Sequence, residues 1–141
     1  MTSLRSAILV TVCLLATAAS ARPPMTGHPI IGTWLLHVSG TTCRETWQFH
    51  SDGTTFNASG DERSTSEYEI SDRPNSEGYY VLSDIIRATN GKPDCFGKAT
   101  PIGDRAVNYL LLEPTGEFIV CSSSSHDSCF ATMARSTHPD S

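Results

Sequence analysis

Apolar and polar residues alternate with a period of two along most of the chain beyond residue 30, and polar turns interrupt the alternation. The alternation is clearest where Cys43, Glu45, Trp47 and Phe49 share one face of a strand. No stretch keeps helical spacing over three turns. The pattern predicts eight strands, over residues 30–38, 43–49, 54–58, 64–70, 79–87, 104–112, 117–121 and 129–135.

Each predicted strand has one face to bury, except the fifth, which is apolar on both faces. The inward residues that the pattern predicts for the first, third and fourth strands are Ile30, Trp34, Leu36, Val38, Thr54, Phe56, Ala58, Tyr68 and Ile70. A meander of this size can close and so remove its exposed edges. We therefore expect an all-β fold, an eight-stranded antiparallel up-and-down barrel in which the last strand pairs with the first near Trp34. A two-sheet sandwich fits the same pattern.

The first 21 residues have the pattern of a secretory signal peptide: a basic start, an apolar run over residues 7–18 and the cleavage sequence Ala19-Ser20-Ala21. We expect cleavage after Ala21 and a secreted or periplasmic protein. Residues 22–29 contain three prolines and are expected to form a tether. The barrel domain is expected over residues 30–135, followed by a flexible tail over residues 136–141.

Charge excludes two classes of partner. The chain after Ala21 has nine lysines and arginines against fifteen acidic residues, a net charge of −6. No basic stripe is present, so neither nucleic acid nor an anionic membrane surface is an expected partner. No run approaches the ~20 apolar residues of a membrane-spanning helix. We expect a monomer of one domain.

Removal of Cys13 with the signal peptide leaves four cysteines, which in an exported protein are expected to form two disulfides. Alternate loops of an up-and-down barrel share one rim, and all four cysteines fall at the same rim. Because Cys43–Cys95 would have to cross the barrel mouth, we expect the pairs Cys43–Cys129 and Cys95–Cys121.

The segment Gly32-Thr33-Trp34 resembles the Gly-x-Trp signature of the lipocalins and the wider calycin superfamily, above all of its small exported bacterial proteins. The resemblance implies that Trp34 packs at the closed end of a lipocalin-like barrel. It also implies that a basic residue of the last strand, here Arg135, lies across the indole ring, where a guanidinium gains cation–π energy.

Candidate chemistry is sparse. Glu45 is predicted to face the lumen, where it must bind a ligand's polar group, pair with Arg87 or Tyr68, or lie at the wet rim. The residues expected to contact a ligand are Glu45, Trp47, Phe49, Phe56 and Tyr68. No histidine spacing supports a metal site, and no nucleophile motif is present, so we expect no metal, no cofactor and no catalysis.

The function that these observations favour is binding of a small apolar or amphipathic molecule in the barrel. The alternative is a module that binds another exported protein through its loops, as inhibitors of proteases or lysozyme do. An open apolar cavity of roughly 300 Å³ or more would favour the first, and a filled lumen with an exposed loop rim the second.

Overall fold

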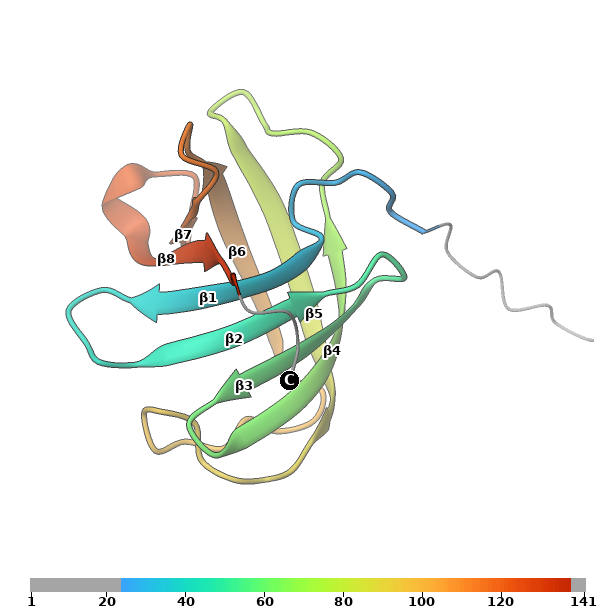
Figure 1. Ribbon diagram of the computed structural model, residues 1–141, viewed down its shortest axis with the longest axis vertical. Helices are drawn as coiled ribbons and strands as arrows, with labels where there is room; N and C mark the ends of the chain where they lie inside the picture. Colours follow the sequence, from blue (N-terminus) through green and yellow to red (C-terminus); the bar gives the residue numbers. More distant parts are fainter. Residues whose placement is uncertain (1–23, 138–141) are drawn as a thin grey trace, which may run out of the picture.

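The computed structural model describes residues 24–137, which form a closed antiparallel barrel in simple meander order (Figure 1). Its strands are β1 (Gly32–Val38), β2 (Arg44–Phe49), β3 (Thr54–Ser59), β4 (Glu62–Ile70), β5 (Tyr79–Thr89), β6 (Arg105–Leu112), β7 (Phe118–Cys121) and β8 (Cys129–Arg135). The described residues contain one helical turn, η1 (His126–Ser128). Within them, no helix has the length and apolar character needed to cross a membrane.

The barrel closes between its first and last strands, as the sequence predicts. β1 pairs with β2 on one side and with β8 on the other, and Trp34 is opposite Arg135 in the second ladder. In Figure 1, β8 lies beside β1 at the front of the barrel. Because every strand has two neighbours, the sandwich alternative is excluded for the described residues.

One end of the lumen is filled by apolar side chains. Trp34 and Phe118 pack edge to face with ring centroids 5.1 Å apart, and Phe49 and Tyr68 do so at the same distance. All four are at most 2% exposed. The buried residues that complete this core are Ile30, Leu36, Ile70, Leu82, Leu110, Val120, Ala131 and Met133. Packed apolar side chains thus fill this end of the lumen.

The segment before β1 closes the apolar end. Two hydrogen bonds hold the backbone of this segment. The backbone N–H of Met25 donates to the Ser51 carbonyl at 2.7 Å, and the Trp34 indole donates through Nε1 to the Ile30 carbonyl at 2.6 Å. The described part of the expected tether, residues 24–29, therefore packs onto the barrel. The signal peptide, its cleavage site after Ala21, Cys13 and residues 138–141 of the tail lie outside the described residues.

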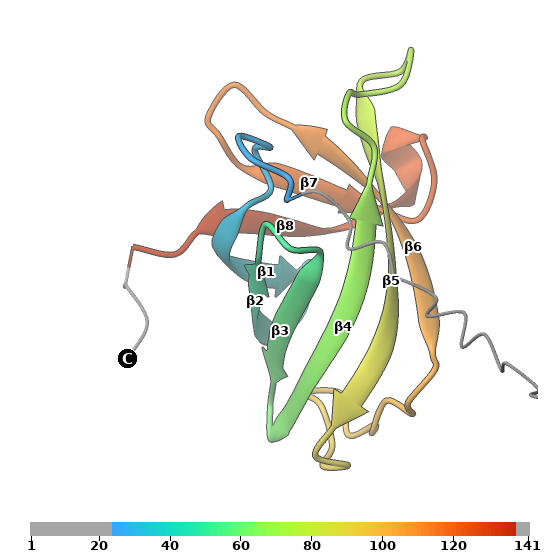
Figure 2. The same cartoon turned by 90° about the vertical axis from the view of Figure 1, so that its right-hand side faces the viewer.

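The long β5–β6 loop, residues 90–104, folds over the opposite end of the barrel, beside the β3–β4 turn (Figure 2). Asp61 donates from its backbone to the Pro93 carbonyl at 3.1 Å, and the Asn90 amide donates to the Asp61 carbonyl at 2.9 Å. The loop passes so close to Gly60 that a β-carbon there would lie 2.8 Å from the Asp94 carbonyl carbon. The loop is thus fastened across this mouth.

The disulfides differ from the predicted pairing. Cys43 is bonded to Cys95 and Cys121 to Cys129, so the expected pairs Cys43–Cys129 and Cys95–Cys121 are wrong. The Cys43–Cys95 bond does cross the mouth, because the β5–β6 loop spans the distance and brings the Cα atoms of the two cysteines to 5.6 Å. Two disulfides are typical of an oxidising extracellular or periplasmic environment.

Candidate ligand-binding cavity

The residues of the Gly-x-Trp motif build the closed end rather than a binding site. The Arg135 guanidinium carbon lies 4.2 Å from the Trp34 ring centroid, which is the stacking that the resemblance implies. Arg135 also donates to the carbonyls of Ile31 at 2.5 Å and Pro29 at 2.7 Å. This arrangement clamps the segment before β1 to the end of β8.

A cavity of about 160 Å³ lies in the other half of the lumen, beneath the β5–β6 loop. The inner faces of β2 to β6 and the loop itself line it. The lining also includes the exposed residues Asp104, at the end of the loop, and Arg105 and Ala106, at the start of β6, so the cavity reaches solvent there. The remaining lining residues are Glu45, Trp47, Asn57, Ser59, Glu62, Ser64, Asp84, Ile86, Asp94 and Thr100.

Glu45 is held in the cavity wall by neutral donors. Trp47 donates through Nε1 to one carboxylate oxygen at 2.8 Å, and Ser59 donates through its hydroxyl to the other at 3.0 Å. The expected pairs with Arg87 and Tyr68 are not formed: Arg87 bonds Glu67, and the Tyr68 hydroxyl donates to the His50 carbonyl. The negative charge of Glu45 therefore has hydrogen-bond donors but no cation.

Two further contacts tie the loop to the cavity wall. The carboxylate of Glu62, which is 6% exposed, accepts from the backbone N–H of Thr100 at 2.7 Å and from its hydroxyl at 3.2 Å. The backbone N–H of Cys95 donates to the Ser59 hydroxyl at 3.3 Å. The β5–β6 loop thus forms a roof whose position depends on groups that also line the cavity.

Asp84 is the least satisfied group in the cavity. Burial raises the pKa of its carboxyl to about 6, the negative charge of Asp104 adds to the rise, and the nearby Ser66 hydroxyl opposes it. Its Oδ1 is fully buried and makes no hydrogen bond with any described residue. The same holds for Asn57 Oδ1, Ser66 Oγ and Thr55 Oγ1. Buried polar atoms without partners are uncommon, and those of Asp84 and Asn57 lie in the cavity wall.

The five residues predicted to bind a ligand separate into three groups. Glu45 and Trp47 line the cavity. Phe49 and Tyr68 face the lumen but belong to the packed apolar end. Phe56 points outward and is 38% exposed, so its predicted lumen position is wrong.

The error at Phe56 comes from assigning the faces of β3 by its most hydrophobic residue. The register places Asn57 opposite Trp47 and Thr55 opposite Phe49, so the odd-numbered polar residues face inward. Phe56 faces out with Thr54 and Ala58, whose predicted inward positions are wrong for the same reason. The predicted ligand contacts also missed the six cavity residues on β3, β4 and β5, which are Asn57, Ser59, Glu62, Ser64, Asp84 and Ile86.

One signal in the sequence could have revealed the polar half of the lumen. β4 alternates strictly between buried and exposed positions, and its buried positions at the cavity end are Glu62, Ser64 and Ser66. A polar residue at every second position of a strand indicates a polar inner face as readily as a polar outer one. The alternation shows that every second residue shares a face, but it does not show which of the two faces points into the lumen.

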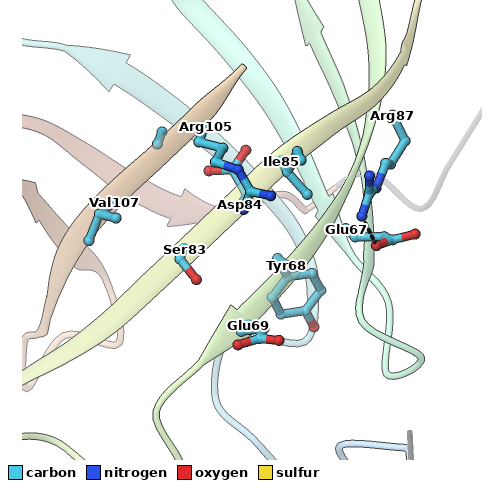
Figure 3. A pocket seen from close by; sticks show the side chains of 10 residues that line it. Glu67, Tyr68, Glu69, Ser83, Asp84, Ile85, Arg87, Arg105 and Val107 are labelled. Atoms are coloured by element: carbon cyan, nitrogen blue, oxygen red, sulfur yellow. Dashed lines mark hydrogen bonds and ion pairs between the residues drawn. The ribbon is translucent and has the colours of Figure 1, made fainter. Parts of the chain in front are cut away.

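A larger hollow of about 360 Å³ lies along β4, β5 and β6, and most of its lining residues are at outward positions (Figure 3). Glu67 and Arg87 form an ion pair of 2.7 Å at one side of it, and Ser83, Ile85 and Val107 also line it. The two paired side chains are more than half exposed. Because solvent screens these groups and they already have partners, we place the candidate site in the smaller lumen cavity.

Metal-ligand geometry is confined to one place within residues 24–137. Cys43, Glu45 and Cys95 offer ligand atoms within 4.8 Å of one another, but the two sulfurs are bonded to each other as a disulfide. The other carboxylates of the cavity do not converge in this way.

Comparisons with known proteins add no relative. No protein-family model matches the chain, and comparison with curated proteins and with solved structures returned no match. The closed eight-stranded barrel is consistent with a lipocalin-like fold, and the likeness to that family rests on this architecture and on the arrangement of Gly32, Trp34 and Arg135.

Proposed function

We propose that this protein is an exported lipocalin-like barrel that binds a small amphipathic molecule in its lumen without transforming it. The observation that carries the proposal is the cavity beneath the β5–β6 loop, where unpartnered oxygens of Asp84 and Asn57 lie in the same walls as Trp47 and Ile86. A bound molecule would satisfy the oxygens and cover the apolar surfaces. The signal-peptide pattern and the two disulfides support export.

The cavity volume limits the size of the ligand that can bind. About 160 Å³ falls short of the roughly 300 Å³ expected above for an open apolar cavity and of the ~300–1,000 Å³ of drug-sized sites. It is close to the ~150 Å³ engineered cavity that accepts benzene. The opposite half of the lumen is packed by Trp34, Phe49, Tyr68 and Phe118 and offers no extension. A long acyl chain or a retinoid-sized ligand does not fit, whereas a single-ring compound with one polar group does.

The proposal of binding without catalysis rests on the lining of the cavity. No histidine lines it within the described residues, and the serine hydroxyl of Ser59 is occupied by Glu45. Glu45 and Glu62 are held by donors of the fold itself, which fixes them as wall groups. Asp84 leaves one carboxylate oxygen without a hydrogen-bond partner among the described residues, and acid–base chemistry of the usual kind needs a second positioned group.

Native mass spectrometry of the protein recovered from its host tests this function. We expect a retained small molecule that is lost in Ala106→Leu, because the added side chain would enter the cavity from β6. Val107→Leu is the matched control, since Val107 is the adjacent residue, faces outward and is 53% exposed. Equal retention by both variants would place the ligand elsewhere and contradict the proposal.

A second candidate function, binding of another exported protein, is favoured by the β7–β8 loop. Cys121–Cys129 closes this exposed loop at its base. Inside it, Ser128 Oγ donates to the Ser125 carbonyl at 2.6 Å, and the backbone N–H of Ser123 donates to Ser128 Oγ at 3.1 Å. A loop held in this way is pre-organised for protein binding. Co-purification of a protein that Asp127→Arg releases would favour this alternative, whereas release by Ala106→Leu would not.

A further inference from the structure

We infer that the lumen cavity selects a small organic cation, a primary amine on a compact apolar body, and that Asp84 is its anchoring acceptor. This inference rests on the proposed function and specifies its ligand class. It follows from the charges, the unpartnered atoms and the apolar surfaces of the cavity.

The charge of the lining is strongly negative. Five carboxylates line the cavity, and its single basic residue, Arg105, is exposed at the opening. The ion pair between Arg87 and Glu67 lies outside the lumen and neutralises none of the five. An anionic ligand would meet uncompensated repulsion there, and a cation would be stabilised in a partly desolvated site. The five carboxylates belong to Glu45, Glu62, Asp84, Asp94 and Asp104.

The unpartnered atoms require a donor. Asp84 Oδ1, when the carboxyl is ionised, and Asn57 Oδ1 accept hydrogen bonds, and both are buried in the cavity walls without partners. Ser66, at 1% exposure, faces the lumen near Asp84, where its hydroxyl lowers the pKa of that carboxyl. An ammonium group carries three N–H donors and no acceptor, which matches such a set.

The remaining walls favour an organic cation over a bare ion. Trp47 and Ile86 provide apolar surface in the same cavity, and an indole face also attracts cations. The lumen carboxylates do not bring three ligand atoms within 4.8 Å outside the disulfide-bonded group, so they lack the convergence that a metal ion needs. A ligand whose compact apolar part packs against Trp47 and whose amine binds Asp84 contacts both the apolar and the acidic walls of the cavity.

The protonation state of Asp84 makes the selection depend on pH. The charged groups that share its cavity are Glu45 on β2, Glu62 on β4, Asp94 and Asp104 in the loop, and Arg105 at the start of β6. Asp84 also lines the outer hollow, which it shares with Glu67, Glu69 and Arg87. With a pKa of about 6, the Asp84 carboxyl is neutral in acid and ionised above neutrality. Amine affinity should therefore rise as the pH increases from about 5 to about 7.5 and then level off.

Calorimetric titration with benzylamine and with benzyl alcohol, its neutral near-isostere, tests the inference. For the unaltered protein, we expect benzylamine to bind about tenfold more tightly at pH 7.5, the difference between a charge-assisted and a neutral hydrogen bond. Asp84→Asn should bring the two affinities within about threefold. Glu77→Gln is the control, because it removes one negative charge from the exposed β4–β5 turn, away from the cavity, and should keep the preference.

The alternative outcomes separate this inference from the proposed function. Equal affinity for the amine and the alcohol would overturn the selection of a cation while leaving a small-molecule site in place. A preference that survives Asp84→Asn would overturn the role of Asp84. If neither compound binds, both this inference and the proposed lumen site are contradicted.

Discussion

The Arg135 side chain occupies the space into which a β-carbon on Gly32 would project. Such a β-carbon would collide with Nη1 of Arg135, and Gly32 has a φ of +123°. The glycine of the Gly-x-Trp motif is thus required twice, for a positive φ and for room beside the backbone. Through that room Arg135 reaches the Trp34 ring and the carbonyls of Pro29 and Ile31.

Gly32→Ala should consequently destabilise the barrel more than an alanine at an ordinary positive-φ glycine. Gly116 is the matched control, with a φ of +87° and nothing within 4 Å of the position that a β-carbon would take. We expect about 1–2 kcal/mol loss of unfolding free energy for Gly116→Ala, and a further 1 kcal/mol or more, roughly, for Gly32→Ala. Urea denaturation checks this. Equal losses of unfolding free energy at the two positions would show that the Arg135 side chain can move aside at no cost.

Arg135→Ala should lower the unfolding free energy by about 1–2 kcal/mol, because it removes the stacking on Trp34 and two hydrogen bonds to carbonyls. Arg135→Lys should restore only part of this, since an ammonium lacks the planar fork that reaches both carbonyls. Full recovery in the lysine variant, measured by the same denaturation, would show that charge alone matters at this position.

The raised pKa of the Asp84 carboxyl predicts how the stability of the protein depends on pH. Its folded-state pKa of about 6 lies above the ordinary value of 3.8, so the neutral carboxyl favours the folded state. That contribution is fully present below about pH 4 and is lost as the pH rises through about 6. Asp84→Asn should therefore be about 1–3 kcal/mol more stable than the unaltered protein at pH 8 and nearly equal to it at pH 4. Chemical denaturation across this range would refute the assignment if the two curves stayed parallel.

The two disulfides should contribute unequally. Cys43–Cys95 closes a sequence separation of 52 and Cys121–Cys129 one of 8, so chain entropy alone predicts about 4 and about 2.5 kcal/mol. Replacing Cys43 and Cys95 by serine should also speed hydrogen exchange in residues 90–104, because that bond fastens the roof. The Cys121 and Cys129 double variant should leave exchange there unchanged. Faster roof exchange in both variants would mean that the β5–β6 loop is not held locally.

The sequence predicted the strand order because the turns and alternating apolar residues repeat along the chain, and each strand begins or ends within two residues of its expected bound. It failed for β3, whose inner face is polar. The rule that the largest apolar residue is buried places Phe56 inward. In the half of the lumen that holds the cavity, that rule is reversed, so the residues that define the candidate site are the ones the pattern concealed.

The disulfide pairing could not be obtained from strand counting, because it depends on the path of a long loop. Residues 90–104 carry no periodic pattern, and their course across the mouth is set by contacts of Asn90, Pro93 and Thr100 with the β3–β4 hairpin. Those contacts are long-range and polar. Only the folded hairpin provides the partners that direct the loop to Cys43.

The most direct measurement of the central claim, a ligand site in the lumen beneath residues 90–104, uses the two tryptophans of the chain. The Trp47 indole N–H bonds Glu45 in the cavity wall, and the Trp34 indole N–H bonds the Ile30 carbonyl in the packed end. In proton–nitrogen correlation spectra recorded during a benzylamine titration, we predict that the Trp47 indole signal shifts and saturates while the Trp34 signal stays in place. A Trp47 signal that does not move, with shifts confined to outward residues such as Phe56 and Val107, would contradict the account.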